Sequence, residues 1–289
     1  MNAVTMTSET TNPEIQPRPV IVHPTDFAAG DASAMAHALA MAMASKSILR
    51  LLQVRVEDEN FFSPTQGLRQ VRDILVGWGA LAAEASYDRW EKDLGLQVSS
   101  ASIVARNARA GILEYLEDAT CNLVVLANYP HKASNRWLDT SVHSNLLRKG
   151  RMMSLFLREG QRRFITPEGR LNLRRVVMPV ATGVDSVPAI RRLQAMIALV
   201  GSHAELKLLH IGKEAPELID ENGAPLNLPI MVREGGVVEM ILATAGMVEA
   251  DVIAMPTVGR HGLIDAVRGS TTVHILEDAR WPLLAVPVG

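Results

Sequence analysis

Glycines and hydroxyl residues near the end of the chain have the spacing of an anion-binding loop. Between two apolar runs the chain carries, in order, Gly259, Gly262, Gly269, Ser270 and Thr271. Glycine lets backbone N–H groups approach a phosphate closely, and the first turn of a following helix adds unpaired donors and a partial positive charge. The stretch from 256 to 271 is therefore a candidate phosphate-binding loop.

Other reactive side chains give weaker signals. Arg260 and His261 lie between the loop glycines. They could meet a phosphate from outside, or could equally form a solvated loop tip. The other histidines lack metal-ligand spacing, and neither a Walker A run nor a GxGxxG fingerprint follows any apolar run. No Ser/His/Asp or Cys/His set stands out. We therefore expect no catalytic residues and no metal site.

Length, charge and cysteine content restrict the class of protein. The 289 residues are 48% hydrophobic, which is enough to fill two cores. A formal net charge of −2 leaves no basic excess, so we expect neither nucleic acid nor an anionic membrane as a partner. No apolar run reaches the roughly 18 to 20 residues of a membrane span. The single Cys121 cannot form an internal disulfide. These features predict a cytoplasmic protein.

Apolar runs alternate with helical patterns along the chain, and these elements must position the loop. Strands are expected at 19–24, 48–54, 97–105, 123–127, 152–158, 175–180, 205–211, 250–255 and 282–288. Helices are expected at 31–45, 66–93, 110–119, 140–148, 185–200 and 272–279. Continuous apolar strands joined by helices are typical of a parallel sheet covered on both faces. The pattern predicts an α/β fold.

The second part of the chain repeats the first with a period of about 155 residues. For example, ELKLLHI at 205–211 corresponds to ILRLLQV at 48–54. We predict a disordered lead, a first domain, a linker and a second domain at 1–18, 19–160, 161–174 and 175–289. The second domain is reduced, because a short loop follows Ile211 where the first domain has a helix of about seven turns.

With these features, residues 19–289 resemble the universal stress proteins in their tandem form. In that family each domain is a five-stranded parallel sheet with helices on both faces, a Rossmann-like fold of the adenine-nucleotide α-hydrolase type. Its first strand ends in Pro-x-Asp, which matches Pro24-Thr25-Asp26. Its fourth strand opens a loop of pattern G-x2-G-x9-G-[ST]. Gly259, Gly269 and Ser270 match the last three positions, and Pro256 stands at the first.

The resemblance implies that an adenine nucleotide such as ATP binds at the ends of the first, second and fourth strands. By position, the contacting residues are Pro179, Val180, Ala181, Ile211, Met255, Gly259, Gly269, Ser270 and Thr271, with Asp26 in the first domain. Ala181 stands where the family has an aspartate, and alanine can neither accept a hydrogen bond nor help to hold a metal ion. The first domain keeps that aspartate, but its loop at 127–141 is poor in glycine.

Because some residues of the family motif are kept and others are replaced, functions of different classes remain open. One is a nucleotide-binding module with a stress-sensing or scaffolding role. Another is a nucleotide-free interaction protein whose site has decayed. A third is slow ATP hydrolysis, with Asp26 as the metal-side carboxylate. The run ATGVDS at 181–186 also faintly resembles the SGGxDS loop of ATP pyrophosphatases, although Asp185 and Ser186 suit an ordinary helix N-cap.

The last expected strand predicts how the domains associate. Residues 282–288 read PLLAVPV, without a charge to protect a sheet edge, which suits pairing with another strand. The resemblance implies dimers joined through such a strand, and an internal duplication could satisfy the same need within one chain. We therefore expect a homodimer or an intramolecular pair of domains.

Overall fold

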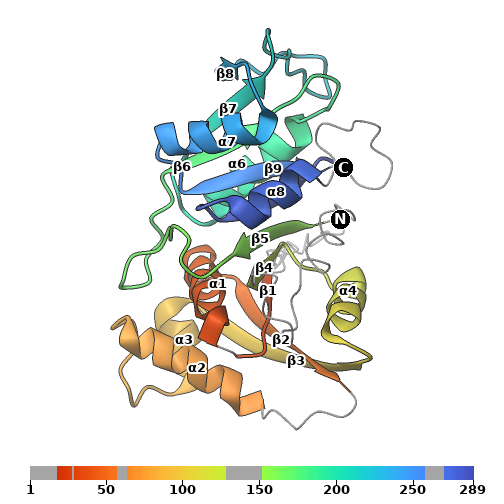
Figure 1. Ribbon diagram of the computed structural model, residues 1–289. Helices are drawn as coiled ribbons and strands as arrows, with labels where there is room; N and C mark the ends of the chain where they lie inside the picture. The colour runs from red at the N-terminus through yellow and green to blue at the C-terminus, as the bar shows by residue number, and fades with distance from the viewer. Residues whose placement is uncertain (1–17, 28, 57–63, 128–151, 258–269) are drawn as a thin grey trace, which may run out of the picture.

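The computed structural model describes residues 18–27, 29–56, 64–127, 152–257 and 270–289. Within these segments the chain forms one 10-stranded sheet with the strand order β3-β2-β1-β4-β5-β10-β9-β6-β7-β8 (Figure 1). Strands β1 to β5 are called the first half below, and β6 to β10 the second half. The expected helix at 140–148 and the loop at 258–269 lie outside the described residues.

The first half follows the expected alternation of strands and helices. Its strands, which pair in parallel, are β1 (Val20–Pro24), β2 (Ile48–Val56), β3 (Gln97–Ala105), β4 (Leu123–Ala127) and β5 (Met153–Leu157). Its helices are α1 (Ala32–Ser45), α2 (Pro64–Gly77), α3 (Tyr87–Leu94) and α4 (Ala108–Asp118), with a 3₁₀ turn, η1 (Ala29–Asp31), before α1. β1, β4 and β5 are short, apolar and almost entirely buried, as a central position in a covered sheet requires, whereas β3 at the edge is partly exposed.

The second half repeats this order with fewer described elements. Its strands are β6 (Arg175–Pro179), β7 (Glu205–Ile211), β8 (Ile230–Arg233), β9 (Val252–Thr257) and β10 (Leu283–Pro287). Its helices are α6 (Val187–Leu199), α7 (Val237–Met247) and α8 (Ser270–Asp278). Both halves have the spatial order third, second, first, fourth, fifth strand. The α/β fold with parallel five-stranded units is therefore confirmed.

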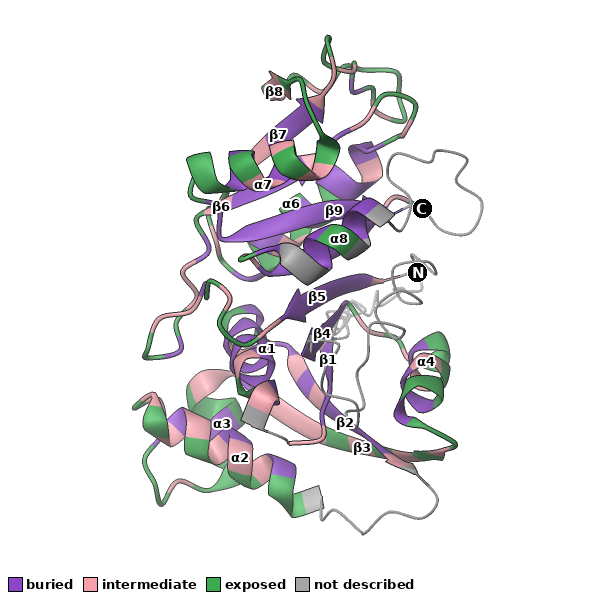
Figure 2. Ribbon diagram, viewed as in Figure 1, coloured by how far each residue is buried: buried purple, intermediate pink, exposed green. Residues whose placement is uncertain are grey.

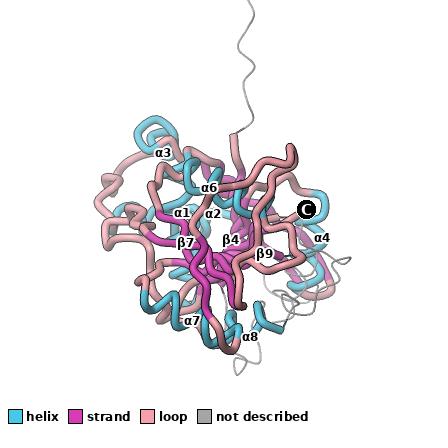
Figure 3. The backbone as a smooth tube through the Cα atoms, turned by 90° about the horizontal axis from the view of Figure 1, so that it is seen from above, coloured by secondary structure: helices cyan, strands magenta, loops and turns pink. Residues whose placement is uncertain are grey.

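Helices cover the sheet on both faces. Figure 3 shows the strands in the middle layer, with α3 and α6 on one side and α7 and α8 on the other. In each half the second and third strands are added on one side of the first strand, and the fourth and fifth on the other side. Since crossovers between parallel strands are right-handed, this reversal places the connecting helices on both faces of the sheet. None of the described helices is long and apolar enough to cross a membrane.

The two halves meet through their last strands. β10 pairs antiparallel with β5, with Leu283 opposite Phe156 and Ala285 opposite Ser154. All residues of both strands are buried, as Figure 2 shows for β5. The apolar edge of β10 is therefore covered by a strand of the same chain, which is the intramolecular pairing that the sequence offered as one of two arrangements.

The connector at 161–174 contacts both halves. Asp251, just before β9, accepts hydrogen bonds from the backbone N–H groups of Arg174 at 2.7 Å and Arg175 at 3.0 Å. At the other end, Phe164 packs edge-on against His37 of α1, with ring centroids 4.5 Å apart. Gly169, with a φ of +73°, lies so close to Trp78 that an added Cβ would be 2.1 Å from the indole ring. The connector is thus packed in place.

The expected single helix at 66–93 is wrong. Two helices, α2 and α3, occupy this stretch, and α2 ends in a Schellman motif at Gly79, whose φ is +67°. The Gly79 N–H donates to the Val76 carbonyl, and the Ala80 N–H donates to the Leu75 carbonyl, both at 2.9 Å. Glycine adopts this left-handed conformation readily, so the helix stops there.

Strand β9 runs past the position where the sequence predicts its end. Pro256 lies within it, opposite Val286 of β10. The N–H of Ile253 donates to the carbonyl of Pro282, and the carbonyl of Thr257 accepts from the N–H of Val288, at the two ends of β10. Because the backbone groups of successive residues point to opposite sides of a strand, the nitrogen of Pro256 points toward β6. The ladder between β6 and β9 ends at Ile253. Because no ladder bond is needed at that point, proline does not interrupt the strand.

Candidate functional site

A small cavity lies at the carboxyl ends of β6, β7 and β9. It has a volume of about 70 Å³ and is lined by Pro179, Val180, Ala181, Val184, Ser186, Ile211, Val237, Ile241, Met255, Pro256 and Thr271. Pro179 and Ile211 are the last residues of β6 and β7, while Met255 lies near the end of β9. In open α/β sheets ligands bind at these strand ends, where the strand order reverses. The described lining contains no charged side chain.

Most of the predicted site residues come together around this cavity. Those that line it are Pro179, Val180, Ala181, Ile211, Met255 and Thr271. Ser270 begins α8, while Gly259 and Gly269 lie outside the described residues. Asp26 follows β1 in the first half and is not among the lining residues. The cavity thus brings together segments that are far apart in the sequence.

Ser186 also lines the cavity, although the sequence suggested only an N-cap role for it. It stands at the N-cap position of α6, but its side chain makes no capping hydrogen bond. Asp185 accepts from the N–H of Val187 at 3.1 Å instead. Ser186 is only 1% exposed, and its hydroxyl has no hydrogen-bond partner in the described part of the chain. A buried hydroxyl without a partner loses its hydration without compensation.

The corresponding position in the first half carries a buried polar cluster. Asp31 precedes α1 as Ser186 precedes α6, and each lies seven residues after the proline that ends the first strand. One carboxylate oxygen of Asp31 accepts from the hydroxyl of Thr25 and lies 3.1 Å from Nε2 of His23. Nδ1 of His23 is 2.8 Å from the carbonyl of Val125. His23, Thr25 and Asp31 are all buried.

The charge of Asp31 controls the protonation of His23. Burial acts to lower the pKa of His23, because it penalises the charged imidazolium. The negative charge and hydrogen bond of Asp31, together with the bond to Val125, outweigh burial and raise the pKa above 6.5. Both ring nitrogens can then donate, one to Val125 and the other to Asp31. The cluster is a buried ion pair in which Oδ2 of Asp31 is paired, while Oδ1 has no hydrogen-bond partner among the described residues.

Apolar residues replace these partners in the second half. Counting from the proline that ends each first strand, Met178 corresponds to His23 and Val180 corresponds to Thr25. Both are buried, and neither side chain offers a hydrogen bond to Ser186. The positions that supply partners to Asp31 in the first half therefore supply none to Ser186 in the second half. Sequence reasoning missed it because N-cap propensity alone does not say whether a cap is formed.

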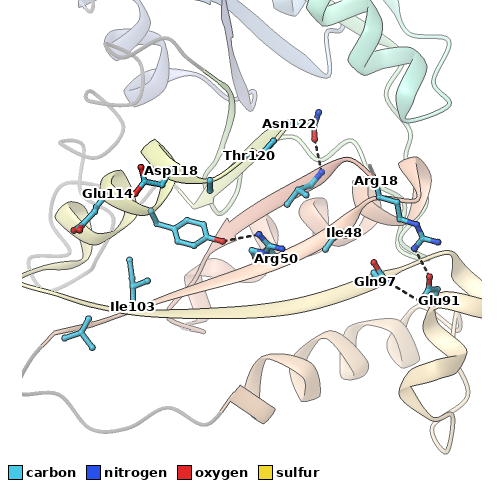
Figure 4. Close-up of a pocket in the computed structure, with 14 residues that line it drawn as sticks. Arg18, Ile48, Arg50, Glu91, Gln97, Ile103, Glu114, Asp118, Thr120 and Asn122 are labelled. Atoms are coloured by element: carbon cyan, nitrogen blue, oxygen red, sulfur yellow. Dashed lines mark hydrogen bonds and ion pairs between the residues drawn. The ribbon is translucent and has the colours of Figure 1, made fainter. Parts of the chain in front are cut away.

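A larger, open cleft of about 1450 Å³ lies elsewhere, beside α4 (Figure 4). Several of its polar groups are already paired with one another. Arg18 forms an ion pair with Glu91 at 2.9 Å, and Arg50 donates to the hydroxyl of Tyr115 at 3.4 Å. Several of its residues, including Val20 and Ile48, begin strands, which is the end opposite the usual ligand site. None of the predicted site residues lines this cleft.

Metal-ligating side chains do not gather in the described segments. Among those residues, no group of three His, Cys, Asp or Glu side chains is placed to hold a metal ion. Cys121 is a free thiol whose pKa is raised by burial to about 11, so it is protonated near neutral pH. The chemistry that the described cavity offers is binding through apolar contacts and hydroxyl groups.

Comparison with known proteins identifies part of the chain and the fold of nearly all of it. Residues 202–287 match the model of the universal stress protein family. A crystal structure of a universal stress protein from Archaeoglobus fulgidus DSM 4304 is similar, with a TM-score of 0.59 and 13% identity over 93% of this chain and 98% of that one. A protein of unknown function from Pseudomonas aeruginosa PAO1 has a TM-score of 0.61 and 16% identity, covering 94% of this chain and 93% of its own.

These findings agree with the resemblance seen in the sequence. No curated protein gives a significant match. At identities of 13% and 16%, the structural likeness establishes the fold and not the ligand. The family match includes β7 to β10, and therefore Ile211, Met255 and the glycine loop. Residues 202–287 thus match the universal stress protein family, and the chain shares the fold of a universal stress protein over 93% of its length.

Proposed function

We propose that this protein is a non-catalytic, universal-stress-type binding protein that holds an adenine nucleotide in the cavity of its second half. The observation that carries the proposal is the position and lining of that cavity. It lies at the carboxyl ends of β6, β7 and β9, and its walls include Pro179, Ile211 and Met255. An apolar slot of this kind suits a flat heteroaromatic ring better than a charged group.

The glycine loop supports the same proposal from the sequence. Gly259, Gly269 and Ser270 keep the spacing of the family motif, and the loop joins β9 to α8. Thr271, in the first turn of α8, lines the cavity. A nucleotide whose base lies in the cavity would have its phosphates near the start of a helix, where unpaired N–H groups stabilise negative charge.

Isothermal titration of ATP into the full chain tests this function. We expect one site per chain, which Gly269→Val abolishes by placing a side chain where the loop must approach the phosphates. Gly223→Val is the matched control, because Gly223 lies in the loop between β7 and β8 and is absent from the lining of the cavity. No heat of binding at millimolar ATP would contradict the proposal.

A nucleotide-free interaction protein is the second candidate, and two observations favour it. The cavity of about 70 Å³ is far smaller than typical ligand pockets of roughly 300 to 1000 Å³. Pro256 and Ala181 also remove a backbone donor and a carboxylate from positions where the family uses them. Native mass spectrometry of freshly purified protein separates the two functions, since a co-purifying nucleotide would exclude the second.

A further inference from the structure

We infer that Ser186 is a ligand-binding residue whose hydroxyl hydrogen-bonds the uncharged ring held in the second-half cavity. This inference rests on the proposed function and adds a residue that the family motif does not contain. Ser186 lines the cavity, is 1% exposed and has no hydrogen-bond partner for its hydroxyl among the described residues. Buried polar groups are almost always hydrogen-bonded, so an unpaired one on a residue that lines a cavity indicates a missing partner.

A structural role for the hydroxyl does not account for its position. A serine before a helix ordinarily caps it by accepting from a backbone N–H two or three residues later. In α6 the side chain of Ser186 makes no such bond, and the carboxylate of Asp185 accepts from the N–H of Val187 instead. The hydroxyl of Ser186 therefore makes no hydrogen bond that would stabilise the described part of the fold.

The first half has a different residue at the equivalent position. There the equivalent Asp31 is held by His23 and Thr25. In the second half Met178 and Val180 stand at the positions of those two partners and leave Ser186 free. In the first half, Oδ2 of Asp31 is paired, whereas Oδ1 has no hydrogen-bond partner in the described segments, like the hydroxyl of Ser186. We expect the ligand in the second half, because the cavity that Ser186 lines is there.

The chemistry of the cavity defines the part of the ligand that enters it. The described lining has no ionisable side chain, so the buried part must be uncharged. A hydroxyl can rotate to donate or to accept, whereas a carboxylate at the same place could only accept. Ser186 can therefore meet an amino group or an oxo group on the ring. The chemistry of the lining is compatible with a neutral purine and does not require the amino group of adenine.

The test compares Ser186→Ala with the matched control Ser202→Ala in the full chain. Titration with ATP, and with adenosine to remove the phosphates, measures affinity, and a thermal melt without ligand measures stability. We expect Ser186→Ala to weaken both ligands about fivefold, as the loss of one hydrogen bond would. Its melting temperature should equal or exceed that of the wild type, since only an unpaired hydroxyl is removed.

Ser202→Ala should behave in the opposite way. Its hydroxyl donates to the carbonyl of Leu173 at 2.9 Å and accepts from the N–H of Ala204 at 3.1 Å, away from the cavity. We expect a lower melting temperature and unchanged affinity. Equal affinity of Ser186→Ala and wild type for ATP would overturn the role of Ser186 and leave the proposed function standing. A wild-type protein that binds neither ligand would overturn both.

Discussion

Asp31 and Ser186 occupy the same position in the two halves of the sheet, each directly before the helix that follows the first strand. The carboxylate of Asp31 is paired with His23 and Thr25. The hydroxyl of Ser186 is buried beside a cavity with no partner in the described segments. Two halves with the same strand order have thus come to differ in polarity at the point where this fold binds ligands.

The His23–Asp31 ion pair predicts how stability depends on pH. Because Asp31 raises the pKa of His23 above 6.5, the pair stabilises the fold fully below pH 6.5. That contribution is lost as the pH rises through the raised pKa. Asp31→Asn should lower the free energy of unfolding by about 3 kcal/mol at low pH, since it leaves His23 buried without its counter-ion. Urea unfolding between about pH 6 and about pH 9 measures the dependence.

His203→Gln is the control for that experiment, because His203 is exposed and lies on the connection between α6 and β7. It should keep both the stability and the pH dependence of the wild type. If Asp31→Asn unfolds with the same free energy as the wild type at each pH, the buried pair does not stabilise the protein.

His37 predicts a loss of stability on the acid side. Burial lowers the pKa of His37 to about 4, so its ring is neutral near pH 7. Nδ1 donates to the carbonyl of Ser33 at 2.7 Å, and Nε2 accepts from the N–H of Phe164 in the connector at 3.3 Å. Protonation would remove the lone pair that Phe164 uses. The contribution of this group is present above pH 6.5 and is lost as the pH falls toward about 4.

His37→Gln checks this assignment, because glutamine does not titrate. We expect the wild type to lose about 3 kcal/mol more than the variant between pH 6.5 and pH 4, measured by urea unfolding. Parallel curves for the two proteins would show that His37 is not the titrating group.

The contact between Trp78 and Gly169 predicts a steric effect on stability. Gly169→Ala adds a Cβ within 2.1 Å of the indole ring at a φ of +73°. Gly160→Ala is the matched control, since Gly160 has a φ of +80° and nothing within 4 Å of an added Cβ. The control should cost about 1 to 2 kcal/mol for its backbone conformation, and Gly169→Ala about 1 to 3 kcal/mol more for overpacking. If the two variants lose the same free energy of unfolding in chemical denaturation, the connector is not packed against Trp78.

Filling the second-half cavity should block binding without unfolding the protein. Ala181 lines the cavity and is partly exposed, so Ala181→Leu adds volume where only about 70 Å³ is open. We expect ATP affinity to fall at least about tenfold. Ala198→Leu, at an exposed position of α6 that does not line the cavity, should bind as the wild type does. Unchanged affinity of Ala181→Leu in calorimetry would place the site elsewhere.

The sequence predicted the fold well where local pattern and burial agree. The expected bounds of 97–105, 123–127 and 205–211 are those of β3, β4 and β7. The break between α2 and α3 was missed, because alanines and a glutamate around 80–85 favour helix and the glycines before them are only a weak stop signal. Pro256 was wrongly taken to end its strand at residue 255, because a proline usually interrupts a strand. Here it is tolerated, since the neighbouring ladder with β6 has already ended.

The candidate site was predictable only in part. The family resemblance gave, by position, the residues at the strand ends, and these line one cavity. The unpaired hydroxyl of Ser186 could not be predicted, because it depends on which groups lie within hydrogen-bond distance in the folded chain. Absence of a partner is a property of the packed structure and not of the local sequence.

Photolabelling with an 8-azido adenine nucleotide tests the central claim most directly, since it marks where the base lies. After irradiation, mass spectrometry of peptides locates the label. We predict labelling in the second half, at residues that line its cavity between Pro179 and Ser186 or near Met255, and loss of label when unmodified ATP competes. Label on Arg50 or Tyr115 in the cleft beside α4, or label that ATP does not displace, would contradict the account.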